Sequence, residues 1–535
     1  MLRWIGLPAD ESTDLGAADP GETVGWRRWA LIAAACFALI AATRWPLVPT
    51  RHLYHIDNVN FALALDDFNP ALHQPQPPGD PMYVALTRGM RPFTPRVEIL
   101  FPVSGILGSA AAMAALWWVG EMLFGARAGW VAALLLALNP VFWLAGVGNY
   151  VRVYLALGSA TVAGLVWKSL VSKSQSQSAT YFCASAAALG LFAGFRPEMS
   201  LLLAPLVFLP HAGLIPALGR RAPLWNWVAA AGCAAATTLP WLLITAEHTG
   251  GLARLYQLNR HFLATQSRHY SLFYGATVRE ALRMAAASIY WIFLGAVPWA
   301  AFVPLAWHHS REDRISRSLA FWLLAFWFVP PFLFFTFVYI EMPDCALVAI
   351  PAVALAGAWT LTRLPARWFW WAAPAALAAT VVLFFYPTQS PFWASNYRIA
   401  EYTMRSAEQI YSRVGLLRKT GPVTVLYLGA YITPREIGYY FPGVPIVNFE
   451  AHPPFVQLGN RFQPALIENG DLILPAGQVI WLDPVSKASA GVFDGLRQAA
   501  GGELGSEGPV HWANLQPGVR FTVGAQRIRV GAQAR

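Results

Sequence analysis

Residues 99–118 read ILFPVSGILGSAAAMAALWW and contain no charged side chain. A helix needs roughly 20 mostly apolar residues to cross the hydrocarbon core of a bilayer. This segment is therefore expected to span a membrane, and other segments share its character, which gives about eleven spans in all. They lie near residues 29–48, 99–118, 130–146, 153–170, 181–195, 200–218, 225–245, 288–307, 319–339, 345–361 and 368–386.

The composition agrees with a multi-span membrane protein. The chain has 535 residues, of which 56% are hydrophobic and 12% are charged, whereas soluble globular proteins carry about 25% charged residues. The net charge of +10 suits loops that face anionic headgroups or a bound phosphate. No basic run with interleaved aromatic residues occurs in a soluble segment, which argues against a nucleic-acid partner.

Three regions follow from the spacing of the expected spans. Residues 1–28 form a cytoplasmic tail, residues 29–386 form the transmembrane domain, and residues 387–535 form a separate domain. With an odd number of spans, the long loops 50–98 and 246–287 lie on the same side as the last domain. The short loops on the opposite side are richer in arginine, which predicts that the long loops and the last domain are extracytoplasmic.

The last region has the pattern of a small α/β domain. Residues 396–417 are expected to be helical in part, and short β-branched runs bounded by Gly, Pro and Asn predict buried strands. The expected strands cover residues 423–428, 445–449 and 478–482, with a strand pair within residues 519–530.

The first long loop holds the strongest candidate for chemistry. Residues 54–70 read YHIDNVNFALALDDFNP, and their apolar side chains recur at helical spacing, which predicts a surface helix over residues 58–68. Asp57 directly precedes this helix. One interpretation makes it the helix N-cap, and another makes it a general base for transfer onto a hydroxyl group. The two roles are compatible.

A proline-rich turn follows in the same loop and reads HQPQPPGDP over residues 73–81. His73 is a candidate to bind a phosphate or to orient a carboxylate, although a plain surface histidine is an equal alternative. The three prolines after it stiffen the turn, which suits the wall of a site. His55, Asn58, His73 and Gln74 are therefore candidate substrate contacts.

An acid after the first span, a short amphipathic helix and a His-Gln-Pro-x-Pro-Pro-Gly turn together resemble the GT-C superfamily of membrane glycosyltransferases. The pattern is similar to that of the family 39 type, which includes protein O-mannosyltransferases and the aminoarabinose transferase. The resemblance implies a GT-C-like α-helical polytopic fold and a sugar donor linked to polyprenyl phosphate. It also implies that Asp57 is the catalytic acid/base residue. Asn58 stands where many members have a second acid, and Asp80 also departs from the pattern.

Two further segments resemble elements of that superfamily. Arg152 and Tyr154 form an Arg-x-Tyr element at an outer helix end, and Arg196 and Glu198 lie in a Gly-Phe-Arg-Pro-Glu junction between two expected spans. Both segments fall on the side of the long loops. They are candidate substrate-binding residues.

The second long loop and a later short loop carry charged candidates. Arg260, His261 and Arg268 can clamp a donor phosphate, since arginine binds phosphate with paired hydrogen bonds, or they can anchor the loop at the membrane interface. Glu341 and Asp344 are acids close to the bilayer, which usually face a cavity or a cation. They are candidate ligands for a divalent metal, and the cofactor is otherwise unknown.

The sequence thus favours a multi-pass protein of the inner membrane that transfers a sugar from a polyprenyl-phosphate donor to an acceptor outside the cytoplasmic membrane. The acceptor, a lipid, glycan or protein, and the sugar stay open. The alternative is a transporter or flippase of a lipid-linked sugar. The absence of an internal repeat and of paired broken helices in matching halves favours the enzyme.

Overall fold

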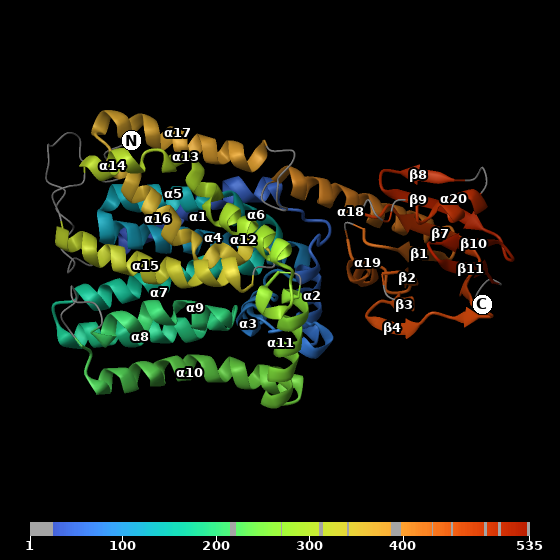
Figure 1. Ribbon diagram of the computed structural model, residues 1–535, viewed down its shortest axis with the longest axis horizontal. Helices are drawn as coiled ribbons and strands as arrows, with labels where there is room; N and C mark the ends of the chain where they lie inside the picture. Colours follow the sequence, from blue (N-terminus) through green and yellow to red (C-terminus); the bar gives the residue numbers. More distant parts are fainter. Residues whose placement is uncertain are drawn as a thin grey trace. The chain divides into compact units, whose positions relative to one another are not determined.

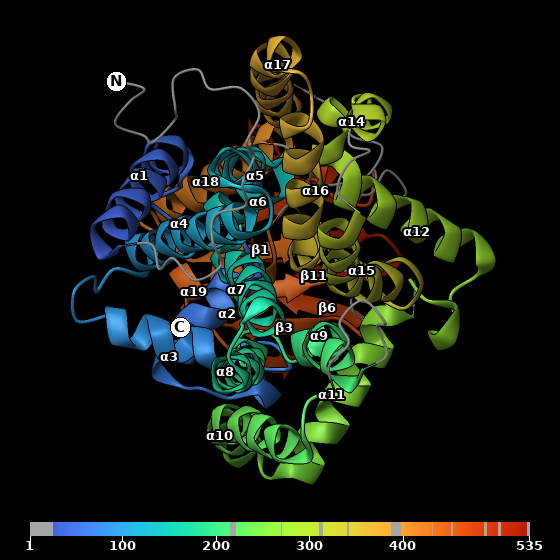
Figure 2. The ribbon, with the colours of Figure 1, turned by 90° about the vertical axis from the view of Figure 1, so that its left-hand side faces the viewer.

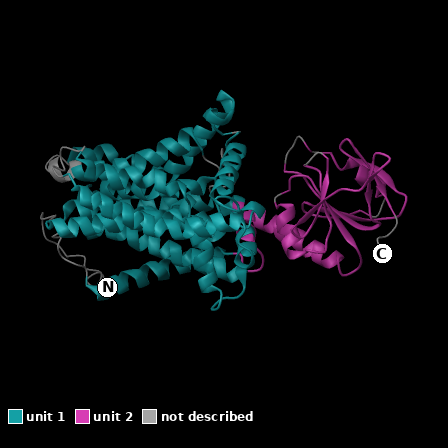
Figure 3. Ribbon diagram, turned by 90° about the horizontal axis from the view of Figure 1, so that it is seen from below, with its two compact units in different colours: residues 1–48, 60–399 teal, residues 49–59, 400–535 magenta. Residues whose placement is uncertain are grey.

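The computed structural model describes residues 25–213, 221–268, 270–309, 314–339, 342–386, 397–430, 432–450, 453–485, 489, 491–500 and 504–531. The chain divides into two compact units, coloured separately in Figure 3. Unit 1 comprises residues 1–48 and 60–399, and unit 2 comprises residues 49–59 and 400–535. A short piece of the first long loop therefore belongs to the same unit as the C-terminal domain, which the sequence analysis did not anticipate.

Unit 1 is a helix bundle (Figure 1). Its helices are α1 (Trp26–Arg44), α3 (Pro81–Met90), α4 (Val97–Phe124), α5 (Ala126–Leu138), α6 (Pro140–Gly148), α7 (Val153–Val171), α8 (Gln175–Ala193), α9 (Glu198–Phe208), α10 (Leu224–Thr249), α11 (Leu252–Ser267), α12 (Val278–Phe293), α13 (Val297–Ala300), α14 (Val303–His309), α15 (Arg314–Phe337), α16 (Ile350–Thr362) and α17 (Ala366–Phe385). Along the bundle, α7 packs between α4 and α8, and α10 lies at the edge beside α8 (Figure 2).

The bundle confirms the multi-span membrane architecture. Among the described residues, 7 helices are long and apolar enough to cross a bilayer, or up to 8 if a bent pair counts as one span. The bent pair is α5 and α6, which meet at an angle of 57°. Asn139 starts the second helix because its side-chain oxygen accepts hydrogen bonds from the amides of Val141 (3.0 Å) and Phe142 (3.2 Å). The expected number of eleven spans stays a prediction.

Small residues let the central helices approach closely. A Cβ atom on Gly120 of α4 would lie 2.8 Å from the Cα atom of Gly129 in α5. A Cβ atom on Gly164 of α7 would lie 2.3 Å from the Trp118 ring of α4. Such glycines are typical of membrane helix interfaces, where close van der Waals packing drives association. This packing fixes α4 and α7 against their neighbours within unit 1.

The first long loop contains α2 (Ile56–Asp66), a short 3₁₀ turn η3 (Pro70–Leu72) and α3. The prediction that Asp57 precedes the helix was wrong. The helix begins at Ile56, so Asp57 lies inside its first turn. The reason is His55, whose carbonyl accepts the Asn58 amide (2.9 Å) and whose ring Nδ1 accepts the Asp57 amide (3.2 Å). An acid in the first turn is still favoured by the helix dipole.

Unit 2 is an α/β domain built on two sheets. The larger sheet has the order β4-β3-β2-β1-β7-β9-β8, with β1 parallel to both β2 and β7, and the smaller has the order β10-β11-β6-β5. The elements are α18 (Tyr397–Leu417), whose last 18 residues lie in the unit, β1 (Val423–Tyr427), α19 (Pro434–Tyr440), β2 (Ile446–Asn448), β3 (Phe455–Leu458), β4 (Arg461–Pro464), β5 (Ile467–Glu468), β6 (Asp471–Leu474), β7 (Gly477–Leu482), α20 (Asp494–Ala499), β8 (Gly505–Glu507), β9 (Val510–Leu515), β10 (Arg520–Val523) and β11 (Gln526–Val530). The expected helix and strands of this domain are confirmed.

The central strand β1 is buried on both faces, as its continuous apolar sequence predicts. Val425 and Tyr427 pack into one core with α18 and α19. Leu426 points to the other face, into a second core that includes Trp481. The face toward α18 and α19 is the one that receives residues 49–59, because Tyr54 packs against its core.

Candidate functional site

Asp57 is positioned by the start of α2. Its side chain is 10% exposed, and the His55 ring Nδ1 lies 3.9 Å from its carboxylate oxygen. The same ring nitrogen accepts the backbone amide of Asp57 at 3.2 Å. The histidine therefore fixes the helix start, while a ring nitrogen that accepts this amide hydrogen has no proton to donate to the carboxylate.

A second carboxyl group of unit 2, which no sequence pattern linked to Asp57, lies close to this pair. Glu436 in α19 is 3% exposed, and its carboxylate accepts the Thr433 backbone amide at 2.7 Å. Burial raises the pKa of Glu436 to about 7; the nearby His55 lowers it and the nearby Asp57 raises it. The Thr-Pro-Arg-Glu sequence at residues 433–436 is a capping-box signature, which predicts that a helix starts there. No local pattern predicts that Glu436 lies near Asp57.

Unit 1 carries a separate buried charge cluster at one end of the bundle. Asp344, in the 3₁₀ helix η9 (Pro343–Val348), accepts a hydrogen bond from the Asn149 side-chain amide at 2.9 Å. The Nε atom of Arg152 lies 3.8 Å from the other oxygen of the same carboxylate. All three side chains are buried. Arg152 stands in the 3₁₀ helix η4 (Tyr150–Arg152) that leads into α7.

The junction between α8 and α9 brings a second buried arginine to the same end. Arg196 is paired with Glu198. Burial alone would lower the pKa of Arg196, but the charges of Glu198, Cys345, Tyr339 and Asp80 raise it well above its ordinary value. The Met82 amide also donates to the Gly194 carbonyl at 3.0 Å, which ties the start of α3 to this junction. Asp80 therefore belongs to the cluster.

These contacts bring together residues that the sequence scattered over four segments. Two guanidinium groups, Arg152 and Arg196, lie at the end of the bundle where Asp344 and Asp80 also lie. Buried guanidinium groups bind phosphate oxygens more strongly than exposed ones, because less water competes for their hydrogen bonds. The arrangement can hold an anion at the bundle end once a carboxylate partner yields its place.

Metal binding by Glu341 and Asp344 stays a prediction, and Asp344 is engaged with other groups. Its described partners are an amide donor and a guanidinium group, and both carry the same polarity as a cation. Glu341 lies outside the described residues. Among those that are described, no group of three His, Cys, Asp or Glu side chains could hold a metal ion.

His73, at the start of the proline-rich turn, contacts α11, whereas Asp80 at the end of the same turn belongs to the charge cluster. His73 adopts a left-handed conformation (φ 56°), and its ring lies 6.0 Å from that of Phe262 in α11. The Gln74 backbone pairs with Asn69, and its side-chain amide, oriented with nitrogen toward Asp67, donates to that carboxylate at 2.9 Å. Gln74 therefore closes the turn.

The remaining predicted contacts divide into exposed and structural residues. Arg260, His261 and Arg268 are exposed on or beside α11, in agreement with interfacial anchoring as much as with phosphate binding. Tyr154 is buried, donates to the Ser104 carbonyl at 2.9 Å and stacks on Phe195. Asn58 is buried within α2.

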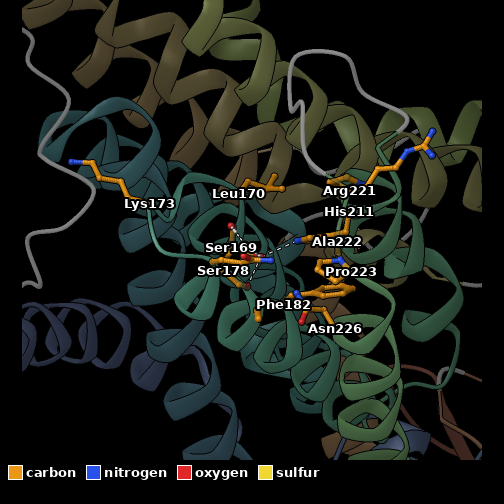
Figure 4. Close-up of a pocket in the computed structure, with 13 residues that line it drawn as sticks. Ser169, Leu170, Lys173, Ser178, Phe182, His211, Arg221, Ala222, Pro223 and Asn226 are labelled. Carbon is orange, nitrogen blue, oxygen red and sulfur yellow. Dashed lines mark hydrogen bonds between the residues drawn. The ribbon is translucent and has the colours of Figure 1, made fainter.

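A pocket of about 380 Å³ lies at the opposite end of α7 and is shown in Figure 4. Its polar floor is satisfied internally, because the Ser169 hydroxyl contacts both the His211 ring and the Ser178 carbonyl at 2.8 Å. Lys173 and Arg221 extend away from it (Figure 4). Both residues nevertheless line the pocket, so its charged groups are basic and none of the lining residues is an acid.

Comparisons with known proteins identify the architecture. The chain is similar to crystal structures of ArnT from Cupriavidus metallidurans, bound to undecaprenyl phosphate (TM-score 0.58) and in the apo state (TM-score 0.54), with 14% identity over 92% of this chain and 100% of that chain. An oligosaccharyltransferase from Archaeoglobus fulgidus in the apo form aligns at 13% identity over 66% of this chain and 55% of that chain, with a TM-score of 0.45. No protein-family model matches the sequence, and neither does any curated protein. The protein therefore has the fold of ArnT, the kind of fold that the resemblance to the GT-C superfamily implied.

Proposed function

We propose that the protein is a glycosyltransferase that moves a sugar from a polyprenyl-phosphate donor to an acceptor hydroxyl on the outer face of the cytoplasmic membrane. The observation that carries the proposal is the fold likeness over 92% of the chain to ArnT, a protein crystallised with undecaprenyl phosphate. The acceptor is a lipid, a glycan or a protein. Membrane lipid surrounds the bundle, and no nucleic acid takes part.

The buried charges at the bundle end support the donor class. Arg152 and Arg196 come from separate helix junctions and are both at least nine-tenths buried. A polyprenyl donor joins an apolar tail to a phosphate, and a helix bundle with arginines at one end matches both parts. The carboxylate partners Asp344 and Glu198 hold these guanidinium groups in place before the donor arrives.

Asp57 is proposed as the catalytic base. In the transfer step, the acceptor oxygen attacks the anomeric carbon and forms the new glycosidic bond. The bond between that carbon and the phosphate oxygen breaks, so polyprenyl phosphate leaves with the electron pair. The acceptor's hydroxyl proton passes to the Asp57 carboxylate, which makes the oxygen a better nucleophile. His55 holds the start of the helix that carries this carboxylate, because its ring accepts the Asp57 amide.

The test compares Asp57→Asn with Asp66→Asn in the same helix. Asp66 pairs with Arg91 at 2.6 Å on an exposed surface, so its loss should change transfer little. The purified protein in proteoliposomes would receive undecaprenyl phosphate loaded with radiolabelled pentoses or hexoses, together with a cell-envelope extract as acceptor. We expect Asp57→Asn to lower transfer by at least about 100-fold, in the range of a lost general base, while undecaprenyl phosphate still binds.

Other outcomes separate the alternatives. Unchanged transfer in Asp57→Asn would remove this residue from the mechanism. Movement of labelled donor across the bilayer with no new glycosidic bond in any extract would favour a transporter or flippase and overturn the enzymatic proposal. Binding of undecaprenyl phosphate alone, without turnover of any loaded sugar, would also contradict it.

A further inference from the structure

The segment just before Asp57 is held by one acid of α18. The Glu408 carboxylate contacts three side chains of that segment. They are the Arg51 guanidinium at 2.7 Å, the His52 ring at 2.8 Å and the Tyr54 hydroxyl at 2.7 Å. These partners are more than 350 residues away in sequence. A single carboxylate therefore joins the segment to the C-terminal domain within unit 2.

The backbone of the same segment is held by two tyrosines. The Leu53 amide donates to the Tyr440 hydroxyl at 2.7 Å, and the Leu53 carbonyl accepts from the Tyr411 hydroxyl at 3.2 Å. Both polar groups of one peptide position are thus satisfied by side chains from α18 and α19, in place of a helix or a strand. The His52 ring lies 4.6 Å from the Tyr411 ring and 4.8 Å from the Tyr440 ring.

These contacts are needed because the segment has no regular structure of its own. Residues 49–55 form neither a helix nor a strand, and α2 begins directly after them. An irregular segment keeps one conformation only where other groups satisfy its backbone and fix its side chains. The direction in which α2 starts, and with it the direction of Asp57, therefore depends on the clamp formed by Glu408, Tyr411 and Tyr440.

The charge of Glu408 suits this holding role. Burial alone would raise the pKa of its carboxyl group, but hydrogen bonds from Tyr54 and His52 and the charges of His52 and Arg51 lower the pKa below its ordinary value. The carboxylate is therefore ionised at neutral pH. Charge-assisted hydrogen bonds of this kind are about twice as strong as neutral ones.

We infer that the C-terminal domain positions the catalytic base: Glu408 and Tyr440 are positioning residues that act through Asp57. The inference rests on the proposed function of Asp57. It assigns the domain a part in turnover rather than a part in acceptor choice alone. Its signature is a loss of kcat without a loss of donor binding, because the clamp touches the base-bearing segment and not the arginines of unit 1.

The experiment uses full-length Glu408→Gln and Tyr440→Phe in proteoliposomes. Glu401→Gln is the matched control, because it makes the same change two helical turns earlier on the same face of α18, where the acid pairs with Arg405 at 2.6 Å. We expect kcat to fall by about 10- to 100-fold in both test variants, as for a displaced catalytic group. KM for the loaded donor and the affinity for undecaprenyl phosphate should stay within about twofold, and Glu401→Gln should match the wild type.

A double-mutant cycle tests whether Glu408 acts through Asp57. In an Asp57→Asn background, Glu408→Gln should cause no further loss of kcat, because no base remains to be positioned. A full additional loss, or a change confined to KM, would overturn the inference. If Glu408→Gln does not fold, Tyr440→Phe supports the same comparison, because it removes one hydroxyl and keeps the ring.

The cycle also separates this inference from the proposed function. If Asp57→Asn keeps full transfer, the proposed base is wrong and the inference falls with it. If Asp57→Asn loses transfer while Glu408→Gln and Tyr440→Phe keep it, only the positioning role is wrong.

Discussion

Glu436→Gln should remove a pH dependence from the stability of unit 2. The wild-type carboxyl is buried in α19, where it accepts the Thr433 amide. Burial disfavours the charged form and raises its pKa from the ordinary 4.5 to about 7, with smaller opposing influences from His55 and Asp57. Glutamine keeps the same shape and an oxygen that accepts the Thr433 amide, but it carries no charge at any pH.

The sign and size follow from linkage. The folded state holds the Glu436 proton more tightly than the unfolded chain does, so the stabilisation is fully present below about pH 4.5 and is lost as the pH rises through about 7. A change from 4.5 to about 7 corresponds to a loss on the order of 3 kcal/mol, at about 1.4 kcal/mol for each pH unit. The variant should keep that stability above pH 7.

Hydrogen exchange of the intact protein measures this locally. After correction for the intrinsic rate, peptides from α19 and β2 should lose protection by up to about 100-fold between pH 5 and pH 8 in the wild type, which is the same free energy. The Glu436→Gln protein should lose almost none. Glu468→Gln, an exposed acid of β5, should behave like the wild type. An unchanged loss of protection in Glu436→Gln would refute the assignment of this pH dependence to Glu436.

Three further variants test the bundle and the sheet. Asp344→Asn keeps an acceptor for Asn149 but removes the negative charge beside Arg152. Undecaprenyl phosphate should therefore bind several-fold more tightly and with a steeper salt dependence, measured by titration at two ionic strengths. Weaker binding would contradict the placement of the phosphate beside Arg152. Gly158→Ala should lower the midpoint of thermal unfolding, because the added Cβ atom would lie 2.6 Å from the Phe192 ring. An unchanged midpoint would show that α7 and α8 can move apart to accept the methyl group. Trp481→Ala should destabilise unit 2 by about 3–5 kcal/mol, seen as faster exchange of β1 and β9 amides; unaltered exchange would contradict its role in the core.

The elements that the sequence predicted well are those whose patterns are local. The strand β1 is a run of five apolar or β-branched residues, and no helical periodicity competes with it. The amphipathic stripe of α18 is equally local, and its buried residues Ala407, Ile410, Tyr411 and Val414 recur at helical spacing. Spans such as α4 were predictable for the same reason, since their apolar length alone requires a bilayer.

The start of α2 could not be predicted from local sequence patterns. Asp57 has a side chain that favours the N-cap, and no local pattern favours His55 in its place. The structure places the ring of His55 on the Asp57 amide, so a histidine takes the capping contact that the sequence assigned to the acid. The contacts of Glu408 could not be predicted either, because its three partners lie more than 350 residues away and no local pattern links them.

The buried ion pairs of unit 1 and the contacts of Glu408 in unit 2 involve different residues, and we assign them different roles in the proposed reaction. In unit 1, Arg152 and Arg196 are already paired with Asp344 and Glu198, so their burial is compensated before any ligand binds. Under the proposed function, a donor phosphate would compete with Asp344 and Glu198 for these guanidinium groups. In unit 2, Glu408 is paired with Arg51, His52 and Tyr54, which are outside the charge cluster of unit 1. Donor affinity and base position can therefore vary independently, which is why a loss of kcat at constant donor affinity is the signature that distinguishes a clamp on the base from a general loss of folding.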